Sequence, residues 1–175
     1  MSSVMPISHH TDPIVSDLRA QVRGLSVAAP RTLVVRAPGT DAALLDVCER
    51  VLSAPLHLES ADLDVEDASV RHAIGYAARE LGVAEVIVIL QSDAVEPSNP
   101  QNDAESLDFM ARVVAARQQK EAGHEAARAK VRACVQTLAG DSALAGVSVA
   151  GLVQIAESGV LLSYDAEQDT FEAML

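Results

Sequence analysis

The sequence predicts an α/β fold in three layers, with a mostly parallel central sheet and a C-terminal β-hairpin. Three observations lead to this prediction. Short apolar runs alternate with longer amphipathic segments, the order expected of parallel strands joined by helical crossovers. The run Val86–Leu90 contains no polar residue, which is typical of a strand buried on both faces. Near the C-terminus, two apolar runs flank Ser158-Gly159, a pair that favours a hairpin turn.

Each helix is predicted from a start signal followed by apolar residues at helical spacing. The start signals are Asp12-Pro13, Asp41, either Asp67 or Ser69, and either Asp103 or Ser106. The last helical region is long; Gly123 either splits it or lies within it, and Gly140 ends it. The predicted helices cover residues 13–24, 42–52, 67 or 69 to 82, and 103 or 106 to 140.

The strands are predicted from short β-rich runs that end in turn residues. The first run ends in Pro38-Gly39, where the glycine allows a backbone conformation closed to other residues. The run at 56–58 predicts a short edge strand, followed by a solvated acidic loop. The predicted strands cover residues 33–36, 56–58, 86–90, 147–155 and 160–164. We expect residues 1–11 to form a flexible tail before a single domain that spans 12–175.

The composition narrows the class of function. An apolar fraction of 49% predicts a folded core. The net charge of −12 disfavours binding to nucleic acid or to an anionic membrane surface, because both need clustered basic residues. No apolar run is long enough for a membrane span and no signal peptide is recognisable, so we expect a cytoplasmic location. Cys48 and Cys134 stand alone in predicted helices, and we expect both to be small buried hydrophobic residues.

The end of the strand at 86–90 is the first candidate site. It leads directly into Gln91, Ser92, Asp93 and Ala94. Open α/β sheets bind their ligands at the carboxyl ends of the strands. Gln91 there either hydrogen-bonds a small anion or a loop carbonyl, or belongs to a polar exit that only caps the sheet.

Three segments, in order, resemble the β-class carbonic anhydrase family. TLVVRAPGT resembles the family's strand and turn VVRNAGN. SVRHAIGYAARELGVAEVIVILQSD resembles its helix–strand unit, in which the strand ends in His-x-x-Cys. VAGLVQIAESGVLLSYD resembles its closing hairpin. The resemblance implies a small parallel sheet, a homodimer or larger homo-oligomer, and a zinc site at the strand tips.

The zinc-ligand pattern of the family is absent from this sequence. Gln91 and Ala94 stand where the family has its ligand His and Cys, and neither replaces an imidazole or a thiolate on zinc. The family's other motif, Cys-x-Asp-x-Arg, fits in two registers. One runs from Val15 and places Asp17 and Arg19 in the Asp–Arg pair. The other runs from His10 and retains Asp12 without the arginine.

The resemblance therefore implies a non-catalytic protein without zinc. It would act by dimerisation and by binding a protein partner or a small anion such as bicarbonate. The vestigial pocket would comprise Arg36 and Gly39 together with residues 91–94, although Arg36 and Gly39 also suit a structural turn. Asp17 and Arg19 are the catalytic candidates, unless both lie on the solvated face of the first helix. The alternative function is an active carbonic anhydrase with an unusual metal set, such as His10 with Asp12 or Asp17, or with no metal.

Overall fold

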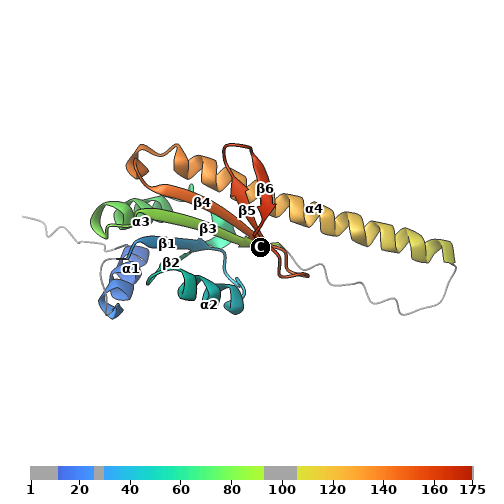
Figure 1. The fold of residues 1–175 in the computed structure, drawn as a ribbon, viewed down its shortest axis with the longest axis horizontal. Helices are drawn as coiled ribbons and strands as arrows, with labels where there is room; N and C mark the ends of the chain where they lie inside the picture. Colours follow the sequence, from blue (N-terminus) through green and yellow to red (C-terminus); the bar gives the residue numbers. More distant parts are fainter. Residues whose placement is uncertain (1–11, 26–29, 93–105, 175) are drawn as a thin grey trace, which may run out of the picture.

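The computed structural model describes residues 12–25, 30–92 and 106–174, with side chains in the last range from Met110 onward. Within these residues, six strands form one sheet in the order β2-β1-β3-β4-β5-β6 (Figure 1). The first four in this order are parallel, and β5 and β6 continue the sheet antiparallel. The strands are β1 (Thr32–Arg36), β2 (Leu56–Glu59), β3 (Glu85–Gln91), β4 (Ser148–Gln154), β5 (Leu161–Asp165) and β6 (Thr170–Ala173). The predicted mostly parallel sheet and the β4–β5 hairpin are confirmed.

Helices cover both faces of the sheet, which confirms the predicted three layers. The helices are α1 (Pro13–Gly24), α2 (Ala42–Val51), α3 (Ala68–Glu80) and α4 (Ser106–Ala139), with short 3₁₀ turns η1 (Ala61–Leu63) and η2 (Ser142–Leu144). One face packs against α1, α3 and the C-terminal half of α4, and the other packs against α2 in the part of the chain that the structure describes (Figure 1). The carboxylates of Asp12, Asp41 and Asp67 cap α1, α2 and α3, as the sequence predicts.

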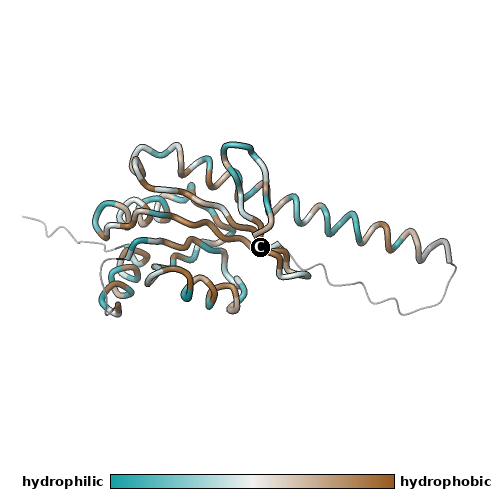
Figure 2. The backbone as a smooth tube through the Cα atoms, viewed as in Figure 1, coloured by the Kyte–Doolittle hydropathy of each residue, from teal (hydrophilic) through white to brown (hydrophobic). Residues whose placement is uncertain are grey.

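The alternation of side chains along the strands divides the core in two. Leu33, Val86 and Val88 belong to the larger core, under α1, α3 and α4. Val34 and Ile87 belong to a smaller core that includes Leu44 and Cys48 of α2. Figure 2 shows the hydrophobic residues concentrated on the central strands, between the helices.

Helix α4 is continuous, so Gly123 does not split it. Its C-terminal half lies directly on β4, where a Cβ added to Gly151 would come within 2.6 Å of Val131 and 2.8 Å of Val135. Its N-terminal half extends away from the body of the protein (Figure 1). The long helix therefore consists of a packed half and a projecting half.

Two further differences from the sequence predictions concern the ends of the chain. The strand β6 was not predicted; it pairs with β5, and Phe171 packs on Tyr164 with ring centroids 5.1 Å apart. The predicted tail at 1–11, and with it His10, lies outside the described residues, as do Asp93 and Ala94. Among the described residues, no helix combines the length and hydrophobicity that crossing a membrane requires.

Candidate functional site

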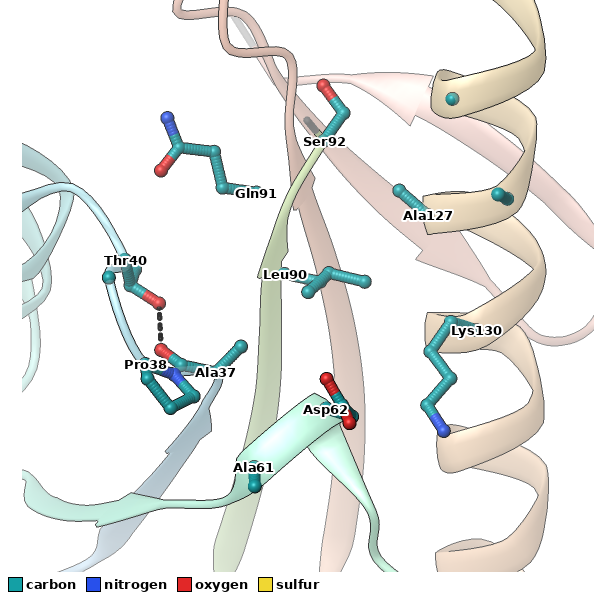
Figure 3. A pocket seen from close by; sticks show the side chains of 13 residues that line it. Ala37, Pro38, Thr40, Ala61, Asp62, Leu90, Gln91, Ser92, Ala127 and Lys130 are labelled. Atoms are coloured by element: carbon teal, nitrogen blue, oxygen red, sulfur yellow. Dashed lines mark hydrogen bonds between the residues drawn. The ribbon is translucent and has the colours of Figure 1, made fainter. Parts of the chain in front are cut away.

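The carboxyl ends of β1, β2 and β3 converge on one pocket, which α4 closes from the side (Figure 3). Its volume is about 800 Å³. Three strand exits and one helix face line it: Ala37, Pro38, Gly39 and Thr40; Ala61 and Asp62; Leu90, Gln91 and Ser92; and Gly123, Ala126, Ala127 and Lys130. A pocket at this edge is the expected ligand position in an open α/β sheet. Three of the predicted site residues, Gly39, Gln91 and Ser92, lie on its wall.

The exit of β1 forms a tight turn. Gly39 adopts a φ of +80°, in the region that residues with a side chain rarely occupy. Thr40 is buried and its hydroxyl donates a hydrogen bond to the carbonyl of Ala37 at 2.7 Å. The turn is therefore fixed by its own bonds, and its backbone forms one wall of the pocket.

The exit of β2 holds a carboxylate at the pocket. Asp62 and Leu63 have φ values of +51° and +52°, left-handed conformations that cost energy for residues with a side chain. Ser60 is buried and its amide donates to the carbonyl of Arg36 at 2.9 Å. The thiol of Cys134 in α4 donates to the carbonyl of Leu63 at 3.3 Å. These contacts fix the left-handed turn, which carries the exposed side chain of Asp62 into the pocket wall.

The exit of β3 presents two polar side chains in different directions. The hydroxyl of Ser92 accepts a hydrogen bond from the backbone amide of Ala156 at 3.2 Å. The backbone amide of Ser92 donates to the carbonyl of Gln154 at 2.9 Å. Ser92 thus ties the strand end to the end of β4. Gln91 extends on the side of Thr40, away from α4 (Figure 3). The Gln91 amide is therefore the polar group of this exit that faces the β1 turn.

Helix α4 contributes small residues and one cation. Gly123, Ala126, Ala127 and Lys130 follow the i, i+3, i+4, i+7 spacing of one helix face. The small residues leave the volume open, and Lys130 extends along this wall toward the level of Asp62 (Figure 3). Lys130 and Asp62 are the charged groups of the described lining, and no ion pair joins them there. The pocket therefore presents one positive and one negative group on different walls.

The sequence analysis did not single out Asp62 or Lys130. The acidic loop after residue 58 was predicted to be solvated. The side chain of Asp62 in this loop is exposed, and it also lies at the pocket because β2 runs parallel to β1. For Lys130, the signal was the helical spacing of Gly123, Ala126 and Ala127 on one side of α4. Small residues at that spacing predict that the helix packs closely on another element, but they do not indicate which strand end it approaches.

The structure places Asp17 and Arg19 on the exposed face of α1, which is the alternative that the sequence analysis left open. Both lie in α1, where the Asp17 carboxylate accepts a hydrogen bond from Gln21 at 2.8 Å. Arg19 donates to the Tyr76 hydroxyl of α3 at 2.7 Å and stacks over its ring at 4.9 Å. Neither residue lines the pocket, because the first helix packs on α3 and on the edge strand rather than entering the sheet. Asp12 caps α1 and is likewise absent from the lining.

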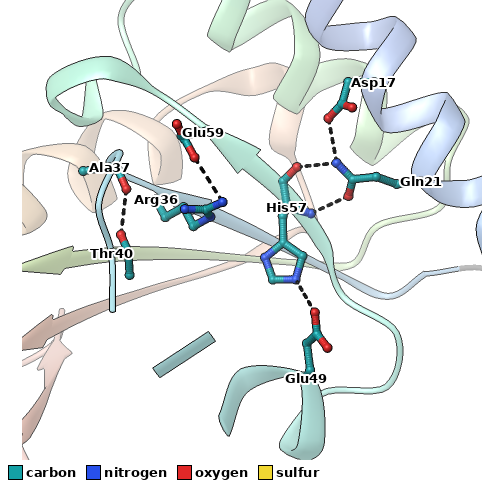
Figure 4. Close-up of polar contacts among 8 residues, drawn as sticks. All are labelled: Asp17, Gln21, Arg36, Ala37, Thr40, Glu49, His57 and Glu59. Atoms are coloured by element: carbon teal, nitrogen blue, oxygen red, sulfur yellow. Dashed lines mark hydrogen bonds and ion pairs between the residues drawn. The ribbon is translucent and has the colours of Figure 1, made fainter. Parts of the chain in front are cut away.

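Arg36 also lies outside the pocket, on the face of the sheet that α2 covers. It pairs with Glu59 of the neighbouring strand at 3.0 Å (Figure 4). On the same face, His57 lies 3.7 Å from the carboxylate of Glu49. Burial lowers the pKa of His57, the charge of Glu49 opposes this effect, and the charge of Arg36 adds to it. This polar cluster joins β1, β2 and α2, and it is separate from the pocket.

The architecture matches that of known solved structures. No family model matches the sequence, and no curated protein matches it. The β-carbonic anhydrase CcaA superposes with a TM-score of 0.59 over 91% of each chain, at 18% identity. A variant of the β-carbonic anhydrase CafD of Aspergillus fumigatus superposes with a TM-score of 0.55 over 79% of this chain and 91% of that chain, at 14% identity.

This chain has the β-carbonic anhydrase fold. A tetrameric β-carbonic anhydrase of Sordaria macrospora is a further neighbour, with a TM-score of 0.53, 13% identity, and coverage of 85% of this chain and 86% of that chain. At these identities the likeness establishes the fold, and the chemistry has to be argued from the side chains of the site.

The donor groups at the pocket do not fit the zinc that the β-carbonic anhydrase fold implies. Zinc sites use thiolate and imidazole ligands, or carboxylates alongside them. The described lining contains neither cysteine nor histidine, and Asp62 is its one carboxylate. Both cysteines are buried, and burial raises the pKa of each thiol, which disfavours the thiolate that zinc requires. Among the described residues, no group of three His, Cys, Asp or Glu side chains is placed to hold a metal.

Proposed function

We propose that this chain is a non-catalytic protein of β-carbonic anhydrase fold that binds a small anion, such as bicarbonate, in the strand-tip pocket. The observation that carries the proposal is the composition of the pocket wall. It offers the ammonium of Lys130 on the α4 side and the amide of Gln91 on the side of the β1 turn as donors, and no imidazole or thiolate in the described lining (Figure 3). Such a wall is suited to holding an anion by charge and hydrogen bonds.

The same composition argues against carbon dioxide hydration. In zinc hydratases the metal lowers the pKa of its bound water to about 7 and so supplies hydroxide at neutral pH. The described wall has no donor set for the metal and no imidazole to act as a base in its place. Binding without turnover is the function that these side chains support best.

We also propose that the protein works as a homodimer or a larger homo-oligomer in the cytoplasm. Self-association has support from the apolar side chains that remain exposed on α2 and α4. The proposed location rests on the sequence argument alone.

Two measurements on the purified protein test the absence of catalysis. Elemental analysis is expected to find zinc well below one equivalent per chain. Stopped-flow measurement of carbon dioxide hydration is expected to give the uncatalysed rate, with and without added zinc. Stoichiometric zinc together with hydration that a chelator abolishes would overturn the proposal in favour of an active carbonic anhydrase.

Calorimetric titration with bicarbonate tests the binding function, with acetate and inorganic phosphate as comparison anions. Lys130→Gln is expected to weaken bicarbonate binding about fivefold or more, since a charged hydrogen bond of this kind contributes roughly 1 kcal/mol or more. Arg23→Gln is the matched control, because it removes one positive charge from an exposed position of α1 outside the pocket. Equal affinities for the two variants would show that the anion does not use this pocket.

A further inference from the structure

Most of the large hydrophobic side chains that stay exposed in the described structure are found at two places. Three lie on the projecting half of α4: Met110 at 57%, Val113 at 45% and Val114 at 50% exposed. Two lie on α2: Val47 at 48% and Val51 at 76% exposed. Exposed apolar side chains grouped in this way mark an interaction surface. We call residues 110–120 of α4 the arm.

The arm has one apolar face. Met110, Val113, Val114 and Arg117 follow the i, i+3, i+4, i+7 spacing that brings side chains to one side of a helix. Gln119 lies on the opposite side, and it too is exposed. In Figure 1 no other helix or strand of the described residues lies beside the arm. A helix of this length is marginally stable in water unless one face is packed, and adjacent valines lower its helix propensity further.

Helix α2 offers a surface of matching kind. Ala43, Val47 and Val51 recur every four residues and form a stripe beside the buried Leu44 and Cys48. Asp46 flanks the stripe with its side chain 58% exposed. Two apolar stripes on helices pack by fitting the ridges of one into the grooves of the other.

The charges of the two surfaces are opposite in sign. The arm contains Arg112, Arg117 and Lys120 and no acidic residue, in a chain whose net charge is −12. Arg117 pairs with Glu121, the residue that follows the arm, at 3.4 Å, and Lys120 lies 3.8 Å from Glu157, so the positive charge of the arm is partly compensated. The segment from Asp41 to Val51 contains three acidic residues and one arginine. Opposite charges favour the encounter of arm and α2, whereas two arms repel each other. The partner that suits the arm is therefore the α2 surface rather than another arm.

The arm does not contact helix α2 of its own chain. The packed half of α4 lies on one face of the sheet, against Gly151, while α2 lies on the other face. Because α4 is continuous, the arm follows the direction of the packed half and leads away from the body (Figure 1). Only a second molecule can present α2 to it.

We propose that the arm of one copy docks on the α2 surface of a second copy, and that the contact is reciprocal. Reciprocity closes the assembly as a dimer with twofold symmetry. The inference rests on the self-association proposed above and names the surfaces that mediate it.

The first test compares Val114→Asp with Gln119→Asp by sedimentation velocity. Both variants add one negative charge to an exposed arm position, the first on the apolar face and the second on the opposite face. We expect the unaltered protein to form a dimer. The dissociation constant of the dimer is expected to change less than twofold in Gln119→Asp and to rise at least tenfold in Val114→Asp. A monomeric unaltered protein, or equal dimers for both variants, would overturn the proposal.

The second test identifies the partner surface by disulfide formation between copies. Val113→Cys and Val47→Cys are made in separate chains, purified, and mixed under mild oxidation. The native Cys48 and Cys134 are buried and provide a low background. A cross-linked species of two chains is expected only in the mixture. Cross-linking of Val113→Cys with itself would instead indicate arm-to-arm contact and overturn the assignment to α2.

Bicarbonate titration of the same variants separates the two proposals. An arm variant that is monomeric and binds bicarbonate normally supports the docking surface and leaves the pocket function intact. An arm variant that stays dimeric overturns the docking surface, whatever its affinity for bicarbonate.

Discussion

The side-chain amide of Gln21 in α1 forms hydrogen bonds with both the backbone carbonyl and the backbone amide of His57 in the edge strand β2. Its Nε2 donates to the carbonyl of His57 at 2.8 Å, and its Oε1 accepts from the His57 amide at 2.8 Å (Figure 4). An uncovered strand edge is a template for pairing with another chain. Gln21 therefore blocks the outer edge of the sheet with one side chain.

Gln21→Ala is expected to destabilise the fold by about 1–2 kcal/mol, because two backbone groups lose their partner. It is also expected to increase aggregation on heating, since β2 becomes an open edge. Urea unfolding and light scattering measure the two effects. Arg23→Ala, an exposed position on the same helix, is the control and is expected to change stability by less than about 0.5 kcal/mol. Equal stabilities for the two variants would rule out a structural role for the Gln21 contact.

Gly151→Ala is expected to destabilise the packing of α4 on β4. The new methyl group would overlap the side chains of Val131 and Val135, at a cost of about 1–3 kcal/mol. Val131→Ala is destabilising by itself but removes the nearer of the two clashes. The double variant is therefore expected to be more stable than the sum of the single effects, by at least about 0.5 kcal/mol. Strict additivity in urea unfolding would show that α4 shifts away from Gly151 instead.

Asp62→Asn is expected to tighten the binding of bicarbonate by up to about fivefold. It removes the negative charge that opposes an anion at the pocket, and an exposed charge contributes roughly 1 kcal/mol at most. Asparagine also tolerates the left-handed backbone at φ +51°, so the turn is expected to survive. Glu80→Gln, an exposed position on α3 outside the pocket, provides the control for net charge. Calorimetric titration that finds the same affinity for both variants would place the anion elsewhere.

The pH dependence of stability is expected to report on His57. Burial holds its pKa below the ordinary value of 6.5. As the pH falls through 6.5, the unfolded chain takes up a proton that the folded protein binds less readily, so the contribution of His57 to stability is lost. That contribution is complete above this pH. Glu49 favours the protonated form, so Glu49→Gln is expected to make the loss larger.

Urea unfolding at a series of pH values from 7.5 to 5 is the measurement for this prediction. His57→Gln is expected to flatten the dependence of the unfolding free energy on pH in this range. His72→Gln, at an exposed position of α3, is the control for the removal of a histidine side chain. Parallel curves for the protein and His57→Gln would contradict the burial argument.

Local sequence signals predicted the elements and many of their boundaries. Asp12, Asp41 and Asp67 start helices because each carboxylate caps the backbone amides that follow it. Gly39 adopts the positive φ expected of it. By contrast, β6 has no strong local signal: its burial pattern is largely exposed, and it forms by pairing with β5.

The sequence left two alternatives open for Asp17 and Arg19. Helical spacing placed them on the solvated face of an amphipathic helix, whereas the family motif made them candidates for its Asp–Arg pair. The structure follows the helical spacing, because Val15 and Leu18 are buried on one side of α1. A period of apolar residues has a physical basis in burial, and a motif that lacks its ligand residues does not.

The sequence by itself determined the alternation of strands and helices, the end of β3 as a candidate site, and the absence of the zinc-ligand motif. Each of these depends on residues close together in the chain. Only the tertiary structure brought Asp62 and Lys130 to the same pocket as Gln91, and took Asp17 and Arg36 away from it. The pocket residues are up to 93 positions apart, from Ala37 to Lys130. Their meeting depends on the order and direction of the strands and on the packing of α4 over Gly151, which no local pattern encodes.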